Sequence, residues 1–337
     1  MYEGIVFLSR KLVRKRASNG KKKLIDEINW LLSLPEKIKI HFPEVLVSYK
    51  NNSIAYYEMP FYDIPTLRQA IFNKIIDEKT VCKILDKIFD FMYVNLYSKK
   101  IQDVPLDFVK KIHFNRFKER INQTRKKAKI FNKILQKKYI IWGKERYLNA
   151  LFLINDFESN KQLINLLSPL WMSQIHGDLH FDNILIDVDK NKVLSNFVLI
   201  DPRGWLQGSD YAYDLGKLWH SIHGLYDFIH KGDFYFNMKE ISDDEIKITL
   251  KYKNISVLKV YRYILENFPK VLDEKYKLSK ADPNWKLRTL FNEAIHFLSL
   301  PDFHLSFDGK EEKAISLYMT GVKILNELWK DYIANYI

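Results

Sequence analysis

The chain of 337 residues contains a single cysteine, Cys82, and lacks the long apolar run that a membrane helix requires. One cysteine excludes an internal disulfide and a metal site built from cysteines. A membrane helix needs about 18 or more consecutive apolar residues. The opening stretch does not read as a secretory signal, because its charges follow a short apolar patch instead of preceding it. We therefore expect no membrane insertion, and a reducing cytoplasm is the simplest location.

Internal repeats and low-complexity linkers are missing from the sequence as well. What is present is a composition typical of a folded protein, with 47% hydrophobic and 15% aromatic residues. The length is sufficient for one large domain or two lobes with a substantial core.

The charge is strongly positive and unevenly distributed. The net charge is +13, yet residues 161–337 hold 22 Lys+Arg and 24 Asp+Glu, a net of −2. The first 160 residues therefore hold the remaining 32 basic and 17 acidic groups, a net of +15. A basic half can attract a polyanion, or its lysines can simply keep helix faces solvated. We interpret the run around Lys126, Lys127 and Lys129 as such a solvated face.

Hydrophobic periodicity predicts a small sheet first and helices afterwards. The expected elements of the first part are strands over 4–9 and 11–17, a helix over 21–35, and a hairpin of 44–50 with 54–60. Helices are expected over 107–140 and 145–169, followed by short strands in "SQIH", "NILID" and "NFVLID". Residues 210–337 are expected to be helical, apart from loops near "HKGDF" and "SLPDFHLSFDGKE".

The predicted fold class is therefore α+β with two lobes. Residues 1–60 would form a small β-rich N-terminal lobe, and 61–337 a large, mainly helical C-terminal lobe that includes a polar loop region over 173–216.

The stretch "SQIHGDLHFDNILI" (173–186) places titratable side chains between two apolar runs. If the strands on either side of this loop pair as a hairpin, the end of the second strand returns beside the loop, and Asp178, Asn183 and Asp201 converge. The Asn183 amide and the Asp201 carboxylate are oxygen donors of the kind that Mg²⁺ prefers. Asp178 is then left to accept a proton from a hydroxyl, and phosphoryl transfer needs little beyond this set and a cation near the phosphates.

Read together, "HGDLHFDN", "LIDPRG" and "DYAYDLGKLWH" resemble the catalytic core of the aminoglycoside phosphotransferase and choline kinase family, relatives of protein kinases. The resemblance covers these motifs and the order of the two lobes. It implies a protein-kinase-like fold, ATP or GTP and Mg²⁺ as cofactors, and a small hydroxylated molecule as the substrate.

The resemblance also implies roles for individual residues. Asp178 would be the catalytic base, His176 would brace the loop, and Asn183 and Asp201 would hold magnesium. Asp214 would accept hydrogen bonds from the catalytic-loop backbone. In the small lobe, Lys15 would contact ATP phosphates, Glu27 would pair with it, and backbone groups of Glu58 and Met59 would bind adenine.

Several of these assignments have alternatives in the sequence. Strand alternation separates Lys15 from Arg14 and Arg16 and favours Lys15 as the inward residue. Asp26 could replace Glu27, and Asn183 could simply cap a strand. His180, His296 and His304 could border the substrate or serve as ordinary structural histidines.

Two departures from the family pattern concern the phosphate site. Only 14 residues precede Lys15, without the usual glycine or serine cluster, so either the first strand is missing or a short turn at Ser9-Arg10 covers the phosphates. The second departure is Pro202 and Arg203 after Asp201. Arg203 adds a permanent cation near the γ-phosphate, and it could grip a phosphate or carboxylate of the acceptor or pair with Asp210.

The function predicted from the sequence is transfer of the γ-phosphate to a hydroxyl of a sugar, polyol or amino alcohol. The main alternative is a pseudokinase or binding scaffold without transfer. A metallo-hydrolase with His176, Asp178, His180 and Asp201 as ligands is a further alternative. An RNA-binding protein using the basic helices at 107–146 is disfavoured, because they show no strand platform of stacking aromatics.

Overall fold

The computed structural model describes residues 4–333, which divide by their internal contacts into two compact units. The first unit comprises the chain up to Asp103 together with Trp171–Asp214, and the second comprises Val104–Leu170 together with the chain from Leu215 onward. The chain therefore leaves the first unit at residue 104, returns to it at residue 171, and leaves again after Asp214. The expected division into 1–60 and 61–337 stays a prediction.

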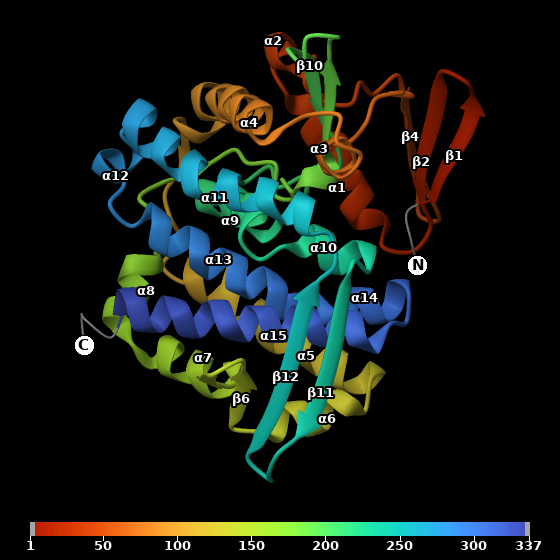
Figure 1. The fold of residues 1–337 in the computed structure, drawn as a ribbon. Helices are drawn as coiled ribbons and strands as arrows, with labels where there is room; N and C mark the ends of the chain where they lie inside the picture. The colour runs from red at the N-terminus through yellow and green to blue at the C-terminus, as the bar shows by residue number, and fades with distance from the viewer. Residues whose placement is uncertain (1–3, 334–337) are drawn as a thin grey trace. The chain divides into compact units, whose positions relative to one another are not determined.

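The first unit begins with a four-stranded antiparallel sheet. Its strands, in the spatial order β1-β2-β4-β3, are β1 (Gly4–Ser9), β2 (Leu12–Ala17), β4 (Ala55–Pro60) and β3 (Val47–Lys50). These are the two strands and the hairpin expected from alternation. Figure 1 shows β1, β2 and β4 as neighbouring strands with α1 beside them.

Helix α1 (Lys21–Ser33) follows the sheet's first hairpin and buries its apolar face. It starts after Gly20, whose φ of 72° is in the left-handed region that glycine adopts without strain. Leu24, Ile28 and Leu31 are buried at helical spacing, and the helix ends just before Pro35. The expected helix is thus present, two residues shorter at its end.

The rest of the first unit consists of short helices and two small strand pairs. α3 begins with a capping box of Thr66 and Gln69, and the side chain of Asp77 caps α4. The elements are α2 (Glu36–Lys39), α3 (Leu67–Phe72), α4 (Glu78–Met92), a π-helix (Tyr93–Tyr97), β5 (Lys100–Gln102) paired with β8 (Met172–Ser173), a 3₁₀ turn (Phe181–Asn183) and the hairpin β9 (Ile184–Val188) with β10 (Leu194–Leu199).

Helix α9 (Tyr211–Ile222) begins in the first unit and continues into the second. Of "SQIH", only Ser173 belongs to a strand, so that expected strand is mostly loop.

The second unit is mainly helical, with one sheet of four strands. Its helices are a π-helix (Lys110–Asn115), α5 (Arg116–Lys127), α6 (Ile130–Gln136), α7 (Ala150–Ser159), α8 (Lys161–Leu167), α10 (Tyr226–Lys231), α11 (Ile255–Tyr276), α12 (Leu278–Ala281), α13 (Trp285–Ser299), α14 (Pro301–Phe307), α15 (Glu311–Leu328) and a π-helix (Trp329–Ile333). Its sheet has the order β11-β12-β6-β7, with β11 (Phe234–Glu240), β12 (Glu245–Tyr252), β6 (Tyr139–Trp142) and β7 (Glu145–Leu148).

This second sheet corrects the helical expectation for 210–337. β12 alternates strictly, with Ile246, Ile248 and Leu250 buried and the residues between them exposed, which is the period of a half-buried strand rather than of a helix. Two further expectations were wrong. The helix expected over 145–169 begins as β7, and the loop expected at "SLPDFHLSFDGKE" contains α14, whose Pro301 occupies the first turn, where proline is tolerated.

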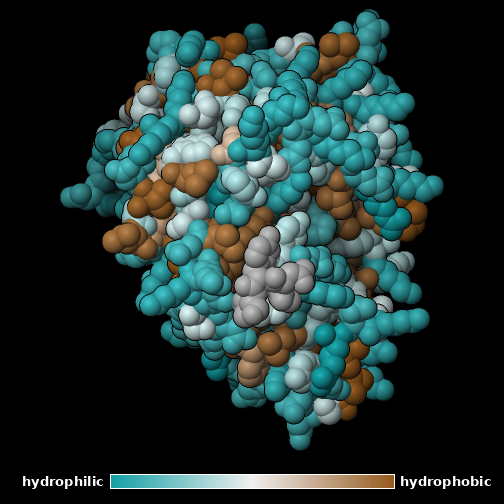
Figure 2. Space-filling model, turned by 90° about the vertical axis from the view of Figure 1, so that its left-hand side faces the viewer, coloured by the Kyte–Doolittle hydropathy of each residue, from teal (hydrophilic) through white to brown (hydrophobic). Residues whose placement is uncertain are grey.

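Helices α13 and α15 form the core of the second unit, and both are buried along most of their length. A Cβ at Gly321 would lie 2.7 Å from Leu298 Cγ, so this glycine permits the close approach of α15 to α13. On the face shown in Figure 2, hydrophilic side chains predominate and apolar ones gather only in small separate patches. Within the described residues, no helix is both long and apolar enough to cross a membrane.

Candidate active site

Strand β2 directs one lysine into the interior of the first unit. Val13, Lys15 and Ala17 are buried on one face of the strand, and only 2% of Lys15 is exposed. Arg14 lies on the opposite face, where its guanidinium pairs with Glu58. The structure therefore places Lys15, rather than Arg14 or Arg16, on the inward face.

The ammonium of Lys15 joins two parts of the chain that are distant in sequence. Its Nζ lies 2.9 and 2.7 Å from the two carboxylate oxygens of Glu27 on α1, and 3.0 Å from Asp201 Oδ1. The Lys15 and Glu27 side chains are almost wholly buried, whereas the Asp201 side chain remains 41% exposed. Asp26 instead forms an exposed pair with Lys22, so Glu27 is the inward carboxylate.

Tyr57 completes this buried group and was not found from the sequence. Its hydroxyl donates to Glu27 Oε1 at 2.8 Å, and it faces Lys15 across the β2–β4 ladder. Burial, followed by the charge of Glu27, raises the pKa of Tyr57 well above its ordinary value, so the hydroxyl remains a donor. The sequence did contain a signal that Tyr57 points inward, because alternation in "IAYYEMP" puts Tyr57 on the same face as Met59.

The charge of Lys15 also acts on Asp201. Burial opposes ionisation of this carboxyl, but the adjacent ammonium and its hydrogen bond outweigh burial and lower the pKa of Asp201. Asp201 is therefore a carboxylate at neutral pH. Its φ of 61° is unusual for a residue other than glycine, and backbone strain of this kind clusters at functional sites.

The loop that contains Asp178 is fixed at its backbone by Asp214. The Asp214 carboxylate accepts from the N–H groups of His176 at 2.8 Å and Gly177 at 2.6 Å, and from the Tyr97 hydroxyl at 2.9 Å. Burial raises the pKa of Asp214 to about 7, although these three donors act to lower it. Tyr97, which lies in a π-helix, was not found from the sequence.

His176 lies beneath this loop as a buried, neutral side chain. Burial lowers the pKa of His176 to about 4. Its Nδ1 accepts from the N–H of Asp178 at 3.2 Å, and its carbonyl accepts from the N–H of Arg203 at 2.8 Å. His176 thus connects the loop of Asp178 to the segment that follows Asp201.

Arg203 is directed at the proposed base. One guanidinium nitrogen lies 3.2 Å from Asp178 Oδ2, a contact that the sequence interpretation did not include. The stem of Arg203 crosses Gly177, where a Cβ would lie 2.6 Å from both Cβ and Cγ of Arg203. Asp210, the partner considered from the sequence, accepts from the N–H of Ala212 at the start of α9.

Asn183 and Asp201 supply oxygen atoms suited to a hard cation. The Asn183 amide nitrogen donates to the Asp178 carbonyl at 2.8 Å, which assigns its side-chain oxygen to the other side. The N–H of Ile200 donates to the Asn183 carbonyl at 3.0 Å, so Asp201 follows directly beside Asn183. One carboxylate and one amide oxygen fit magnesium, which completes its shell with water and phosphate oxygens.

The alternative site for zinc or iron receives no support from the geometry. Nδ1 of His176 and Nδ1 of His180 each accept a backbone N–H of their own loop. Throughout residues 4–333, no group of three or more His, Cys, Asp or Glu side chains is placed to hold a metal ion.

For the remaining predicted residues, the surrounding contacts do not indicate a specific role. Glu58 and Met59 lie at the end of β4, and the Glu58 carbonyl already accepts from the N–H of Leu46 at 2.9 Å. Adenine contacts at these residues stay a prediction. His296 and His304 are buried in the second unit, where His304 Nε2 lies 3.3 Å from the Tyr226 hydroxyl.

Two hydrogen bonds to Asp182, on the loop that follows Asp178, were also not predicted from the sequence. Arg68 Nε donates to Asp182 at 2.6 Å, and the Thr66 hydroxyl donates to the same oxygen at 3.1 Å. This ties the start of α3 to the turn that carries Asn183. Arg68 is the one basic residue of α3, and no pattern in the sequence indicates that Asp182 is its partner.

Comparison with known proteins gives distant likenesses to solved structures and no match of another kind. No family model matches the chain, and no curated protein matches it. Seventy chains of solved structures match, and they include an aminoglycoside-3'-phosphotransferase of type VIII. That match has 14% sequence identity and a TM-score of 0.38, and it covers 96% of this chain and 93% of the other. A likeness this distant assigns neither a fold nor an activity.

Proposed function

We propose that the protein is a phosphotransferase that moves the γ-phosphate of ATP, with Mg²⁺, to a hydroxyl of a small metabolite. The observation that supports this best is the three-way contact of Lys15 with Glu27 and Asp201. A buried cation held between two carboxylates, one of them still partly exposed, is arranged to meet phosphate oxygens beside a metal ligand. Asp178 lies on the adjoining loop.

Each residue has a separate task in this proposal. Lys15 supplies positive charge to the ATP phosphates, and Glu27 keeps its ammonium in place. Asp178 accepts the proton of the acceptor hydroxyl as the new P–O bond forms and the bond to ADP breaks. His176 and Asp214 position the loop. Asn183 and Asp201 would hold magnesium, which supplies charge neutralisation at the phosphates when bound.

Arg203 adds a cation next to the base. Without substrate its guanidinium rests on Asp178. When the γ-phosphate or an anionic acceptor arrives, that group competes for the same guanidinium, which suits planar bidentate contacts with phosphate or carboxylate oxygens.

The acceptor we propose is neutral or anionic, such as a sugar or polyol. A polycationic aminoglycoside would be expected to require carboxylates on the helical part of the chain, yet residues 161–337 carry a net charge of only −2. An amino alcohol held by aromatic side chains is the next choice. The cytoplasm remains the proposed location, since the single Cys82 cannot form an internal disulfide.

The proposal is tested with Asp178→Asn. Turnover on a panel of sugars, polyols and amino alcohols should fall by about 10²–10⁴-fold, the usual contribution of a general base. Nucleotide affinity with Mg²⁺ should stay within about threefold of wild type, because the nucleotide contacts of Lys15 and Asp201 are kept. Asp187→Asn, an exposed residue of β9, is the control and should change neither quantity. Undiminished turnover in Asp178→Asn would refute the role of the base.

A nucleotide-binding scaffold without transfer is the second candidate. Strand β1 forms the edge of the sheet and exposes Ile5, Val6, Phe7 and Leu8, and the glycine or serine cluster of a phosphate-covering loop is missing from it. Mg²⁺-dependent binding of ATP, with no phosphate transfer to water or to any acceptor of the panel, would favour this candidate.

A further inference from the structure

The excess positive charge of the chain originates in one segment. Residues 108–144 contain 13 Lys+Arg and a single acidic residue, Glu119. Subtracting these from totals of 54 and 41 leaves 41 basic and 40 acidic residues in the rest of the chain. Residues 108–144 include α5 and α6 of the second unit.

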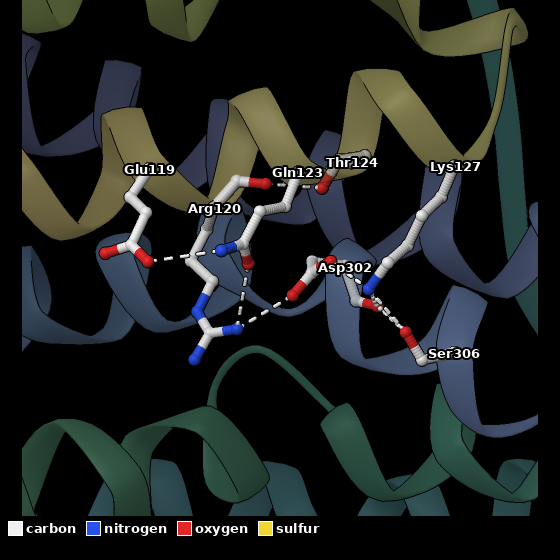
Figure 3. Close-up of polar contacts among 7 residues, drawn as sticks. All are labelled: Glu119, Arg120, Gln123, Thr124, Lys127, Asp302 and Ser306. Atoms are coloured by element: carbon white, nitrogen blue, oxygen red, sulfur yellow. Dashed lines mark hydrogen bonds and ion pairs between the residues drawn. The ribbon is translucent and has the colours of Figure 1, made fainter. Parts of the chain in front are cut away.

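One side of α5 is neutralised within the protein. Arg120 Nη1 lies 2.7 Å from Asp302 Oδ2, and Lys127 reaches the same carboxylate and the Ser306 hydroxyl. Figure 3 shows these side chains pointing from α5 toward α14, with Gln123 bridging Arg120 and Glu119. The basic residues on this side are therefore committed to packing α5 against α14.

The opposite side of α5 is open and basic. With 3.6 residues per turn, Asn122, Arg125 and Lys126 lie away from Arg120 and Lys127. Together with Asn132 of α6, they line a hollow of about 460 Å³. Arg125 Nε donates to Asn132 Oδ1 at 3.0 Å, which fixes the guanidinium at the rim of this hollow.

Further cations follow from this hollow along α6. Lys129 and Lys133 are exposed. In the part of the chain that the structure describes, no carboxylate lies within ion-pair distance of Arg125, Lys126, Lys129 or Lys133. These four side chains form a basic strip that lacks ion pairs, and the carboxylate of Glu240 acts on the Lys133 end of it only at longer range.

We infer that this strip binds the phosphodiester backbone of a nucleic acid, without sequence preference. Lysine, arginine and asparagine side chains are the groups that contact backbone phosphates. A concave surface fits the protruding backbone of a nucleic acid better than it fits the flat surface of a membrane. Between residues 107 and 151, all of them described, no large apolar side chain is exposed for insertion into lipid. The lack of stacking aromatics, which spoke against RNA in the sequence, is no obstacle to backbone binding.

The test uses the full chain and a fluorescein-labelled single-stranded RNA of about 20 nucleotides and mixed sequence. Four phosphate contacts predict that affinity falls about 50-fold between about 50 and 200 mM salt, from a slope of roughly −0.7 per contact. Arg125→Gln combined with Lys126→Gln should reduce that slope by about 1.4 and weaken binding at low salt by more than tenfold. The test does not depend on phosphotransfer, because each experiment measures binding of RNA.

The matched control is Lys247→Gln with Lys251→Gln, which removes the same charge from the exposed face of β12. This control should change affinity by less than about threefold. Equal weakening by both double variants would overturn the inference, because net charge alone would then explain binding. Tight, salt-sensitive binding to phosphatidylserine vesicles but not to RNA would overturn it as well. Circular dichroism at both salt concentrations verifies that each variant is folded.

Discussion

At the scale of single residues, the buried pair of Lys15 and Glu27 has a measurable consequence for stability. Glu27→Gln removes the buried charge that neutralises the Lys15 ammonium and keeps the partly exposed carboxylate of Asp201 beside it. Breaking one side of a buried ion pair costs about 3–5 kcal/mol, and we expect about 3 kcal/mol here because Asp201 remains. Urea unfolding followed by tryptophan fluorescence measures this loss.

Asp26→Asn is the matched control for Glu27→Gln. Its carboxylate pairs with Lys22 at the surface of the same helix, and exposed pairs contribute about 0–1 kcal/mol. If the two variants lost the same free energy of unfolding, Lys15 would not depend on Glu27.

The sequence predicted the positions of Lys15 and Glu27 because strand and helix periods decide which side of an element is buried. Partners of long side chains were harder to predict. Arg203 reaches Asp178, and Arg68 reaches Asp182 across 114 positions of sequence. Neither contact follows from local pattern, since an arginine has several carboxylates within its reach and only the fold decides which of them it contacts.

At the scale of secondary-structure elements, Gly204 decides how closely the segment after Asp201 approaches α1. A Cβ at this position would lie 2.2 Å from the backbone carbon of Asp26 and 2.4 Å from the nitrogen of Glu27. Gly204→Ala should therefore displace α1 and lower stability, and under the proposed function it should weaken nucleotide binding as well. Gly20→Ala is the control, because its φ of +72° is nearly the same as +75° at Gly204 and no atom lies within 4 Å.

Both glycine variants incur the cost of a left-handed residue, about 1–2 kcal/mol. Only Gly204→Ala adds a collision with helix backbone, so its loss of stability should exceed that of Gly20→Ala by more than about 1 kcal/mol. Chemical unfolding of the two proteins provides the comparison. Equal losses of unfolding free energy in the two variants would mean that the loop and α1 move apart without a measurable cost.

The second sheet shows where element-level prediction from the sequence reached its limit. β12 alternates clearly, yet it lies between helical segments, and we expected helix throughout 210–337. β12 pairs with β11 in a local hairpin, which its alternation could have indicated. Its other neighbour, β6, is more than 90 residues away, so that pairing is invisible to a local window. The first sheet was predicted correctly because all of its strands lie within the first 60 residues.

At the scale of the whole molecule, the chain passes from one unit to the other more than once. The first unit takes up Trp171–Asp214 after the excursion of Val104–Leu170 into the second. A linear scan favours a boundary where composition changes, near residue 60, and cannot detect a segment that returns. The motifs themselves were recognisable because their spacing is local, although "DYAYDLGKLWH" runs from the first unit into the second.

Buried neutral histidines in both units predict a common response to acid. Burial is the main cause that lowers the pKa of His113 and His304 to about 3 and that of His176 to about 4. Unfolding exposes each one to an ordinary pKa of about 6.5, so the unfolded chain binds more protons. The stability that these histidines confer is complete above pH 6.5 and is lost as pH falls toward the folded pKa.

Each such histidine should cost about 2 kcal/mol of stability between about pH 7.5 and pH 5. Asp214 acts in the opposite direction, because its raised pKa favours the folded, protonated state as pH falls. Its protonation offsets about 2–3 kcal/mol of the stability that the histidines lose. His223 acts in the same direction as Asp214, because burial lowers its pKa but the charge of Glu293 outweighs burial and raises it. The wild type should therefore lose at most about 3 kcal/mol over this range. His304→Gln removes one titrating group and keeps a polar group near Tyr226, so it should lose only about 1 kcal/mol. Urea unfolding of both proteins at the two pH values measures the difference, and identical losses would show that His304 takes up its proton in the folded state as readily as in the unfolded one.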